Sequence, residues 1–330
     1  LTDNGFKVYN QVYSNSSFTN GAILNLFMMQ PDMSVLFQGL SDVSMTAHNI
    51  FGGSNNNLLY SYLKKNNYII SSYYNNQNYY FYNQGNLLDY TIQELDSSHL
   101  NILHNIAPNL SYVIRGSAHQ SRIKNERDIY PLSFKHIQRI NKFNQPSFFF
   151  MKPTNQLHLI SRKGTVLGSS YKHWISSKIY QKGVELMNQE LLQLIDEIEK
   201  NDSDALIVFV GDHGHKFLDA ATGDYDIFNN GLNYIKGKYP RFNLSSEQII
   251  EDFYSVFLAI KMPQSAKGTL KIDSYYSYAD LFRHIFAALD DNPVFLENKS
   301  DDISVNIEGL ILRKGDKIYD DGEKASSSKK

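Results

Sequence analysis

The stretch from Tyr180 to Gly214, YQKGVELMNQELLQLIDEIEKNDSDALIVFVGDHG, decides the fold class of this chain. Its first part has apolar residues at steps of three and four, which is the spacing of an amphipathic helix. The polar run 201–204 ends that spacing, and the apolar run 205–210 is typical of a strand covered on both faces in a parallel sheet. The polar loop 211–214 follows directly. The stretch therefore predicts a helix, a buried strand and a loop at the strand's carboxyl end.

The same alternation of helix and apolar strand recurs along the chain. Residues 147–151 and 253–260 are strand-sized apolar runs, and residues 278–289 have the apolar spacing of a helix. The Asn- and Tyr-rich segment 55–90 begins with helical spacing and continues into a strand at 68–70, although its composition also fits a low-complexity, prion-like segment. The alternation predicts an α/β fold, specifically an α/β/α sandwich around a mainly parallel sheet.

The length and composition set the domain organisation. A chain of 330 residues with 42% hydrophobic residues can bury the core of one large domain or of two smaller ones. Because no linker interrupts the pattern, we expect a single domain over residues 1–321, with a smaller C-terminal portion from about residue 240. Residues 322–330 lack apolar side chains, so we expect them to form a flexible tail.

Charge and cysteine content exclude several classes of function. The formal net charge of -2 gives no bulk attraction to nucleic acid or to an anionic membrane surface, so we expect no nucleic-acid partner. The absence of cysteine excludes disulfides, thiolate metal sites and cysteine nucleophiles. No apolar run approaches the roughly 20 residues of a membrane span. Any anionic substrate must therefore be attracted by a local site.

Asp212 and His213 are the strongest candidates for such a site. They follow an apolar strand, and ligands of open α/β sheets bind beyond the carboxyl ends of the strands. One carboxylate and one imidazole together form half of a typical divalent-cation site. Glycines at 211 and 214 allow the backbone to turn sharply around the pair. The alternative is an ordinary tight turn with both side chains solvated, but the preceding apolar strand favours a metal-ligand pair.

A resemblance to a known family makes this prediction more specific. Residues 204–214 resemble the metal-binding strand and loop of the sulfatase-like branch of the alkaline phosphatase superfamily. The resemblance implies an alkaline phosphatase-like fold in which Asp212 and His213 bind one divalent metal ion, Mn²⁺, Zn²⁺ or Mg²⁺. The other segments that are similar to the family, in the same order along the chain, are 146–151 with the downstream His158, then 256–263 and 277–282.

The nucleophile of this family lies where residues 13–27 resemble a strand end leading into a helix. The segment lacks the Cys/Ser-x-Pro-x-Arg pattern of formylglycine sulfatases and instead resembles the threonine branch, which includes lipoteichoic acid synthases and phosphoethanolamine transferases. The resemblance implies that Thr19 is the nucleophile and also a metal ligand, because coordination lowers the pKa of a hydroxyl group. Thr19 as an ordinary helix N-cap, and Ser16 or Ser17 as the nucleophile, remain alternatives.

The second catalytic candidate is His158. It follows the apolar run 147–151 and is similar to the family's substrate-facing histidine, which implies that it donates a proton to the leaving group or hydrogen-bonds a phosphoryl oxygen. A solvated loop histidine is the alternative. His215 is a further candidate ligand, although a role outside the metal site is the simpler interpretation.

One feature of the family has no counterpart in the sequence. The family's first strand ends in an acidic metal ligand upstream of the nucleophile, whereas Asp3 is the only acidic residue before Thr19. Residues 1–6 have the pattern of a turn that enters the next strand. We therefore expect the first strand to be missing from this chain, which would weaken metal binding. A pseudoenzyme that never had the strand is the alternative.

The resemblance implies a metal-dependent transferase that moves a phosphoglycerol- or phosphoethanolamine-type group onto an envelope lipid or glycan through a covalent Thr19 intermediate. Alternatives are a phosphate- or sulfate-ester hydrolase of the same superfamily and a non-catalytic sulfatase-like binding module. We expect the full-length protein to lie in the bacterial cell envelope, at the periplasmic or extracellular face of the inner membrane, with a possible membrane tether; a cytoplasmic location stays open. A nucleotide-binding module is disfavoured because neither a Gly-x-Gly-x-x-Gly loop nor a Walker motif is present.

Overall fold

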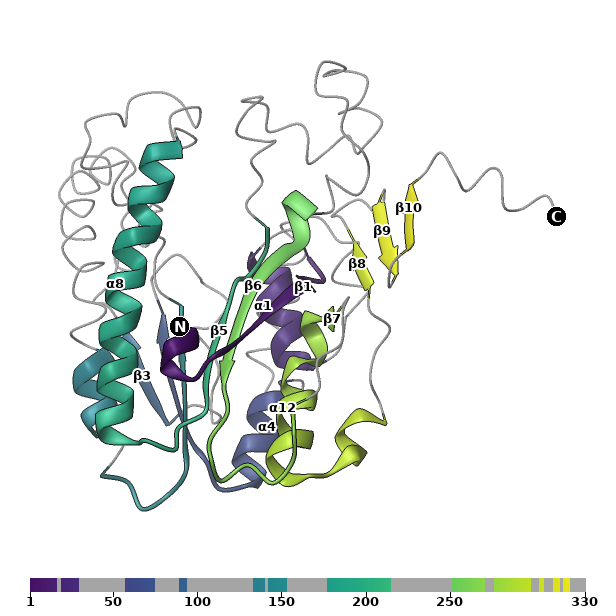
Figure 1. Cartoon of the computed structure of the whole chain (residues 1–330). Helices are drawn as coiled ribbons and strands as arrows, with labels where there is room; N and C mark the ends of the chain where they lie inside the picture. Colours follow the sequence, from purple (N-terminus) through teal and green to yellow (C-terminus); the bar gives the residue numbers. More distant parts are fainter. Residues whose placement is uncertain are drawn as a thin grey trace, which may run out of the picture. The chain divides into compact units, whose positions relative to one another are not determined.

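The structure is a computed structural model of the whole chain (Figure 1). It describes residues 1–16, 19–29, 57–74, 89–93, 133–139, 142–152, 177–214, 251–270, 276–297, 303–305, 311–314 and 317–320. These residues fall into two compact units, which are described separately below. Unit 1 comprises Leu1–Leu59 and Asp204–Lys330, and unit 2 comprises Tyr60–Ser203. The expected tail, 322–330, lies outside the described residues.

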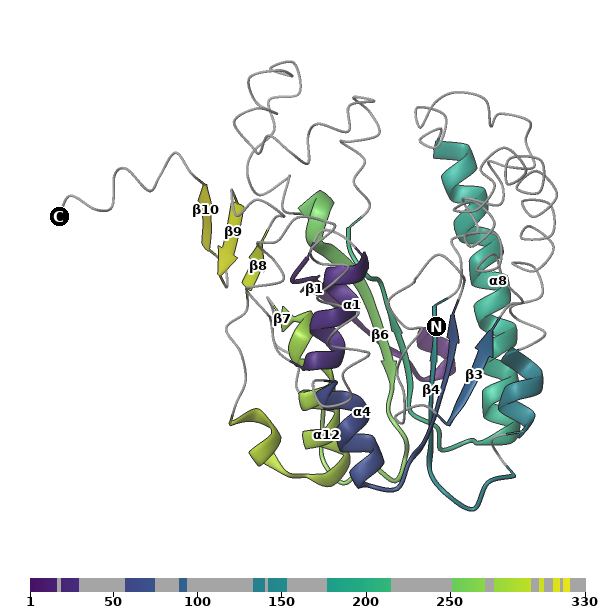
Figure 2. The same cartoon turned by 180° about the vertical axis from the view of Figure 1, so that it is seen from behind.

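The centre of unit 1 is a four-stranded mixed sheet with the order β5-β6-β1-β7 (Figures 1 and 2). Its strands are β1 (Lys7–Tyr13), β5 (Ile207–Val210), β6 (Ser255–Lys261) and β7 (Tyr276–Ser277). β6 runs antiparallel to both β5 and β1, and β7 runs parallel to β1. The carboxyl ends of β1, β5 and β7 therefore share one edge of the sheet, where β6 begins. We call it the carboxyl edge.

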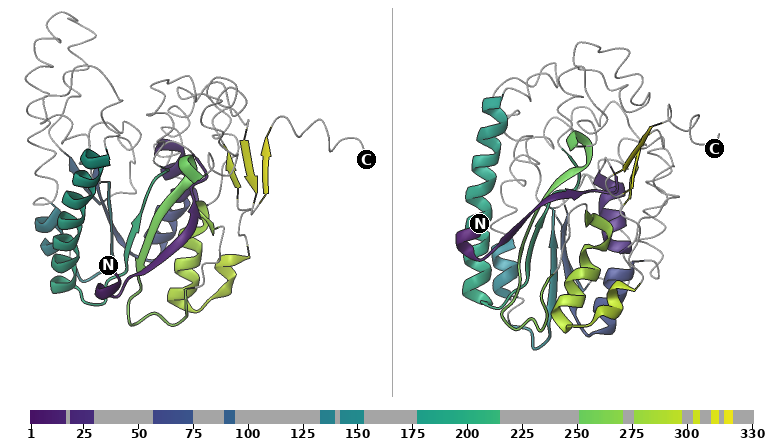
Figure 3. Two further views of the ribbon diagram at one scale, coloured as in Figure 1. Left: turned by 45° about the horizontal axis from the view of Figure 1, so that its top comes forward. Right: turned by 45° about the vertical axis from the view of Figure 1, so that its right-hand side comes forward.

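Two helices follow strands that end at the carboxyl edge. α1 (Thr19–Met28) comes after β1, and α12 (Leu281–Asp290) comes after β7 through the short 3-10 helix η5 (Tyr278–Asp280). Both helices lie on the same face of the sheet (Figure 2; Figure 3, right). All residues from 21 to 29 are buried, so α1 is enclosed on every side, whereas α12 buries mainly the apolar face that its spacing predicted.

The remaining elements of unit 1 are short. The 3-10 helices η1 (Thr2–Asn4) and η6 (Pro293–Leu296) precede β1 and follow α12. The strands β8 (Ile303–Val305), β9 (Ile311–Lys314) and β10 (Lys317–Asp320) form an antiparallel sheet in the order β10-β9-β8 (Figure 3). On the main sheet, Phe6 stacks on Phe209 with ring centroids 5.3 Å apart, which adds an aromatic contact to the burial of apolar area.

Unit 2 contains a three-stranded sheet in which every described pairing is parallel. Its strands, in the order β3-β2-β4, are β2 (Ile69–Tyr74), β3 (Tyr90–Gln93) and β4 (Ser147–Met151). The helix α8 (Ser177–Asn201) belongs to this unit, residues 133–139 are also helical, and α4 (Leu58–Lys65) begins at the boundary between the units.

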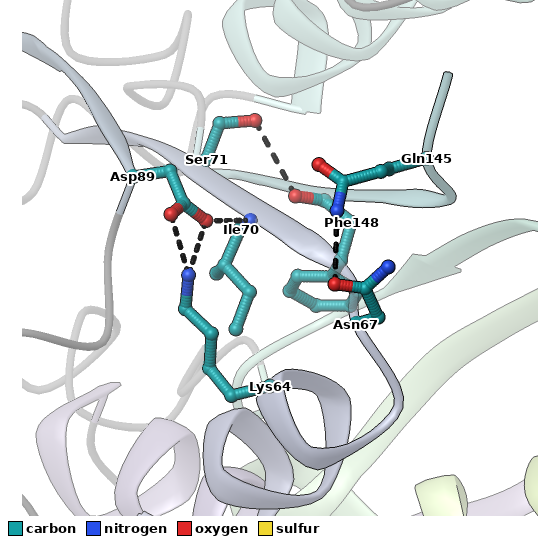
Figure 4. A network of polar contacts seen from close by, with 7 residues as sticks. All are labelled: Lys64, Asn67, Ile70, Ser71, Asp89, Gln145 and Phe148. Atoms are coloured by element: carbon teal, nitrogen blue, oxygen red, sulfur yellow. Dashed lines mark hydrogen bonds and ion pairs between the residues drawn. The ribbon is translucent and has the colours of Figure 1, made fainter. Parts of the chain in front are cut away.

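A polar network joins the elements of unit 2 (Figure 4). Asp89, just before β3, accepts a hydrogen bond from the backbone N–H of Ile70 at 2.7 Å and forms an ion pair with Lys64 of α4. Asn67 accepts from the side-chain amide of Gln145 at 2.9 Å, which ties the turn before β2 to the segment before β4. One carboxylate thus fixes the spacing between a helix and two parallel strands.

Most of the predicted elements are confirmed. α8 covers the amphipathic stretch, β4 matches residues 147–151, and the helix and strand expected within 55–90 are α4 and β2. The strand expected at 253–260 begins later, at Ser255, because residues 251–254 are helical. In the part of the chain that the structure describes, no helix is long and apolar enough to cross a membrane.

One prediction about the sheet is wrong. The apolar run at β5 was expected to have parallel neighbours and full cover, yet its described neighbour, β6, is antiparallel, and only Ile207 of its residues is buried. The physical reason is that an apolar run reports how much of a strand is shielded from water and carries no information about strand direction. The parallel arrangement holds for unit 2 and only for the β1–β7 pair within the main sheet of unit 1.

Candidate functional site

The loop that carries Asp212 and His213 lies at the carboxyl edge, against the beginning of β6. Gly211 donates its N–H to the carbonyl of Phe257, and Gly214 donates to the carbonyl of Phe253, both at 2.8 Å. A Cβ at position 214 would lie 2.3 Å from the carbonyl oxygen of Asp252, so only glycine fits there. The second glycine of the motif is thus explained by a close backbone approach.

The geometry of the Asp212–His213 pair suits a divalent cation. The backbone N–H of His213 donates to Oδ1 of Asp212 at 3.1 Å, and Nδ1 of His213 lies 2.8 Å from the carbonyl oxygen of Gly214. A carbonyl can only accept, so Nδ1 carries the proton and Nε2 is the unprotonated nitrogen. Nε2 and Oδ2 of Asp212 are 3.7 Å apart. Two ligands at about 2.0–2.2 Å from one metal ion are at most about 4.4 Å apart, so both atoms can reach the same ion.

These two side chains form only part of a metal site. Within the described residues, no group of three or more His, Asp, Glu or Cys residues could hold a metal ion. Further ligands must therefore come from a hydroxyl group, such as that of Thr19, or from residues outside the described ranges, which include His158, His215 and Ser17. The pair fits a divalent metal as a half-site, with one hard oxygen and one borderline nitrogen donor.

Tyr278 is a residue of the site that the sequence analysis missed. It is the first residue of η5, is 2% exposed, and lies close enough to feel the charge of Asp212. Burial, and to a smaller extent the Asp212 carboxylate, raise the pKa of the Tyr278 phenol far above its usual value. The phenol therefore stays neutral and does not compete for a cation as a phenolate. β7 is only two residues long, so its sequence has no strand pattern from which the following turn could be predicted.

The loop from β1 into α1 is fully buried although it is polar. Ser14, Asn15 and Ser16 are each 0% exposed. Ser14 donates its N–H to the carbonyl of Tyr254 at 2.8 Å, and its Oγ donates to the carbonyl of Ser16 at 2.8 Å and accepts from the N–H of Ser16 at 3.3 Å. A nucleophile must reach substrate, so the burial of Ser16 disfavours it as the alternative to Thr19.

The loop after β1 and the loop of Asp212 lie on either side of the chain that enters β6. Gly214 is bonded to Phe253 on one side of the chain that enters β6, and Ser14 is bonded to Tyr254 on the other side. With adjacent strands about 4.8 Å apart, the two loops are separated by about 10 Å. Thr19 is the first residue of α1, and the structure describes its backbone alone. The predicted catalytic contact between Thr19 and the metal ligands therefore stays a prediction.

Comparison with known proteins supports the fold. No family model and no curated protein matches the sequence. The structure of Ps i-CgsB in complex with k-i-k-neocarrahexaose is 12% identical, with a TM-score of 0.50, and the match covers 98% of this chain and 79% of that one. The lipoteichoic acid synthase LtaP from Listeria monocytogenes is 14% identical, also with a TM-score of 0.50, and the match covers 96% and 74%. This chain has an alkaline phosphatase/sulfatase-type fold.

The likeness extends along nearly the whole chain. A third structure, the C-terminal periplasmic domain of EcEptC from Escherichia coli in complex with Zn, is 13% identical over 97% of this chain, with a TM-score of 0.49. The resemblance stated in the sequence analysis is confirmed as a shared fold by the first two structures, whose matches cover 98% and 96% of this chain. At these identities a structural match establishes the fold and not the reaction.

Proposed function

We propose that this chain is a metal-dependent transferase that moves a phospho-alcohol group, of the phosphoglycerol or phosphoethanolamine type, onto an envelope lipid or glycan. The observation that carries the proposal is the Asp212–His213 pair, with Nε2 and Oδ2 3.7 Å apart, at the edge of the sheet from which α1 also starts. The fold, shared with a lipoteichoic acid synthase, supports the same assignment. In this proposal residues 1–321 belong to one catalytic domain.

Asp212 and His213, together with the hydroxyl of Thr19, would hold a Mn²⁺, Zn²⁺ or Mg²⁺ ion. When bound, the ion supplies positive charge that favours the Thr19 alkoxide and offsets the charge on phosphoryl oxygens. Because Thr19 is the first residue of α1, the backbone N–H groups of the helix N-terminus would lie beside this nucleophile and favour an anionic group there.

The reaction then proceeds in two displacements at phosphorus. In the first, the Thr19 alkoxide forms a bond to phosphorus, the bond to the donor's alcohol oxygen breaks, and His158 gives that oxygen a proton. In the second, the acceptor's hydroxyl oxygen attacks phosphorus, its proton passes to His158, and the bond to Thr19 breaks. The enzyme returns to its starting state, with the phospho-alcohol group on the acceptor.

The test uses a chromogenic phosphodiester, bis(p-nitrophenyl) phosphate, with Mn²⁺ or Zn²⁺. Thr19→Ala is expected to lower turnover about 1000-fold or more, because removing one member of a catalytic unit disables the unit, whereas Thr19→Ser keeps a hydroxyl and retains part of the activity. Mass spectrometry of the quenched reaction should find the phosphoryl adduct on the peptide that contains Thr19. Turnover by Thr19→Ala at the parent's rate would exclude Thr19 as the nucleophile.

A second candidate is a phosphate- or sulfate-ester hydrolase that acts on a glycan, with water as the acceptor. The observation that favours it is the shared fold with a protein solved in complex with a neocarrahexaose. Turnover of p-nitrophenyl sulfate, or release of product without capture by an added alcohol such as glycerol, would identify this activity. A non-catalytic binding module predicts no turnover and no stoichiometric metal after dialysis, as measured by metal analysis.

A further inference from the structure

A single buried hydrogen bond links the two segments that leave the carboxyl edge beside each other. The parallel pair β1–β7 ends with Tyr13 opposite Ser277, and both chains then turn away from the sheet. Immediately beyond, the side-chain oxygen Oδ1 of Asn15 accepts a hydrogen bond from the N–H of Ala279 at 2.9 Å. Asn15 and Ala279 are both 0% exposed, so water cannot replace this bond.

The segments joined by this bond lead to two different parts of the site. Asn15 belongs to the loop that continues into α1 and Thr19, whereas Ala279 follows Tyr278, whose buried side chain lies within the electrostatic reach of Asp212. The first segment is also bonded to the chain entering β6 through Ser14 and Tyr254. On the other side of the chain that enters β6, the carbonyl of Phe253 accepts a hydrogen bond from Gly214, in the loop that carries Asp212 and His213.

These hydrogen bonds run from the turn after β7, through the loop after β1 and the chain that enters β6, to the loop of Asp212. Among them, the bond of Asn15 with Ala279 is made by a side chain to the backbone, whereas the bonds at Tyr254 and Phe253 join backbone groups. The opposite end of α1 is held separately, because Nε of Arg283 donates to the carbonyl of Met29 at 2.7 Å. Position 15 is therefore the place where a substitution would release the start of α1 and leave the rest of the helix anchored.

We propose that Asn15 is a positioning residue for the transfer reaction: its amide oxygen holds the loop that carries the nucleophile against the turn that follows β7. The proposal rests on the function proposed above, with Thr19 as the nucleophile. Asn15 acts through α1 and does not touch the substrate. Its side chain sets where the first turn of α1 lies with respect to the metal ligands, and a displacement of about 1 Å at a reacting group lowers turnover by about 100-fold.

A matched control exists at the opposite edge of the same sheet. There Oδ1 of Asp204 accepts from the N–H groups of Gln264 and Ser265, at 2.6 and 3.2 Å. Asp204→Ala removes the same kind of bond, side-chain oxygen to backbone N–H, far from α1 along the strands. Asn15→Asp is the conservative variant, because a carboxyl group keeps a carbonyl-type oxygen to accept from Ala279 whether or not it is protonated.

The experiment measures turnover of bis(p-nitrophenyl) phosphate with Mn²⁺ and amide hydrogen exchange, for the full chain and the three variants, well below the lowest Tm. Asn15→Ala is expected to lower kcat about 100-fold with KM nearly unchanged, and to speed exchange at Ala279 and at residues 21–24. Asn15→Asp is expected to recover most of the loss in kcat. Asp204→Ala should match the parent in both measurements.

The outcomes separate this inference from the proposed function. Equal kcat for Asn15→Ala and Asp204→Ala, or a loss that appears only in KM, overturns the positioning role. If the parent itself turns over no phosphodiester with any of the three metals, the proposed function fails. Hydrogen exchange then decides the inference: faster exchange in the first turn of α1 for Asn15→Ala alone supports it, and unchanged exchange overturns it.

Discussion

The two edges of the main sheet in unit 1 use the same kind of bond in opposite surroundings. At the carboxyl edge, the oxygen of Asn15 accepts from Ala279 with both residues fully buried. At the other edge, the oxygen of Asp204 accepts from Gln264 in full contact with water. A buried bond cannot exchange with water, so its loss leaves an unsatisfied group, whereas the exposed one can be replaced. The carboxyl edge is therefore the rigid edge, as a site that aligns reacting groups requires.

The sharpest way to break this comparison is to disturb the carboxyl edge at Gly214. A Cβ there would lie 2.3 Å from the carbonyl oxygen of Asp252, so Gly214→Ala must shift the loop that carries Asp212 and His213. We expect a loss of stability of about 1–3 kcal/mol and metal binding weakened by about 10–100-fold. Denaturant unfolding and calorimetric titration with Mn²⁺ measure the two effects.

Gly211→Ala is the control for this substitution. Its Cβ would come no closer than 3.4 Å to the backbone nitrogen of Phe257, which is close to an ordinary contact. We expect metal affinity near that of the parent. If the two alanine variants bind metal equally, the close approach at position 214 does not position the loop.

The next largest effect is expected from the buried bond itself. Asn15→Ala leaves the N–H of Ala279 buried without this acceptor, which should lower the free energy of unfolding by about 1–3 kcal/mol. Asp204→Ala should have a smaller effect, because water can satisfy the exposed N–H groups of Gln264 and Ser265. Urea unfolding of both variants tests the difference. Equal losses would contradict the contrast between the two edges.

A buried histidine in unit 2 predicts how the stability of the protein depends on pH. His136 is 6% exposed, and its Nε2 lies 2.8 Å from Oγ of Ser71. Burial, followed by the charge of Arg139, lowers the pKa of His136 below its ordinary value of 6.5. The folded state thus favours the neutral ring, so its contribution to stability is present above pH 6.5 and declines as the pH falls from there toward the lowered pKa.

His136→Gln should remove that dependence. The measurement is Tm between pH 7.5 and 5.0 for the parent and the variant, at constant ionic strength. The parent is expected to lose more stability than the variant over this range. In the parent, the unfolded state binds a proton at His136 more readily than the folded state does, whereas glutamine does not titrate. Parallel curves would show that His136 does not titrate in a buried environment.

The smallest effect is expected at the exposed edge. Hydrogen bonds from Ser265, and then from the backbone of Gln264, lower the pKa of Asp204 below its ordinary value of 3.8 despite its exposure. Its contribution is therefore present above pH 3.8 and is lost as the pH falls through the lowered pKa. Asp204→Asn should flatten the acid limb of the stability curve only slightly, and 1 M salt should reduce the difference further. A large, salt-independent difference would contradict the exposed character of this edge.

Local patterns were sufficient to predict several elements of both units. The three- and four-residue spacing of 184–198 predicted α8, and the apolar run 147–151 predicted β4. The Asp212–His213 pair could also be found from sequence, since polar residues directly after an apolar strand lie at a sheet edge. Each of these signals is contained in a short window of the chain, which is why it could be seen without the structure.

What the sequence determined by itself is most of the elements, the place of the Asp212–His213 pair after an apolar strand and the resemblance that the shared fold confirms, because these can be read from short stretches of the chain. Tertiary structure alone decided that β6 runs antiparallel and that Asn15 meets Ala279, 264 positions away. It also decided that Tyr278 is buried in the turn that follows β7. Strand direction and such distant contacts are set by chain packing, on which hydrophobic spacing carries no information.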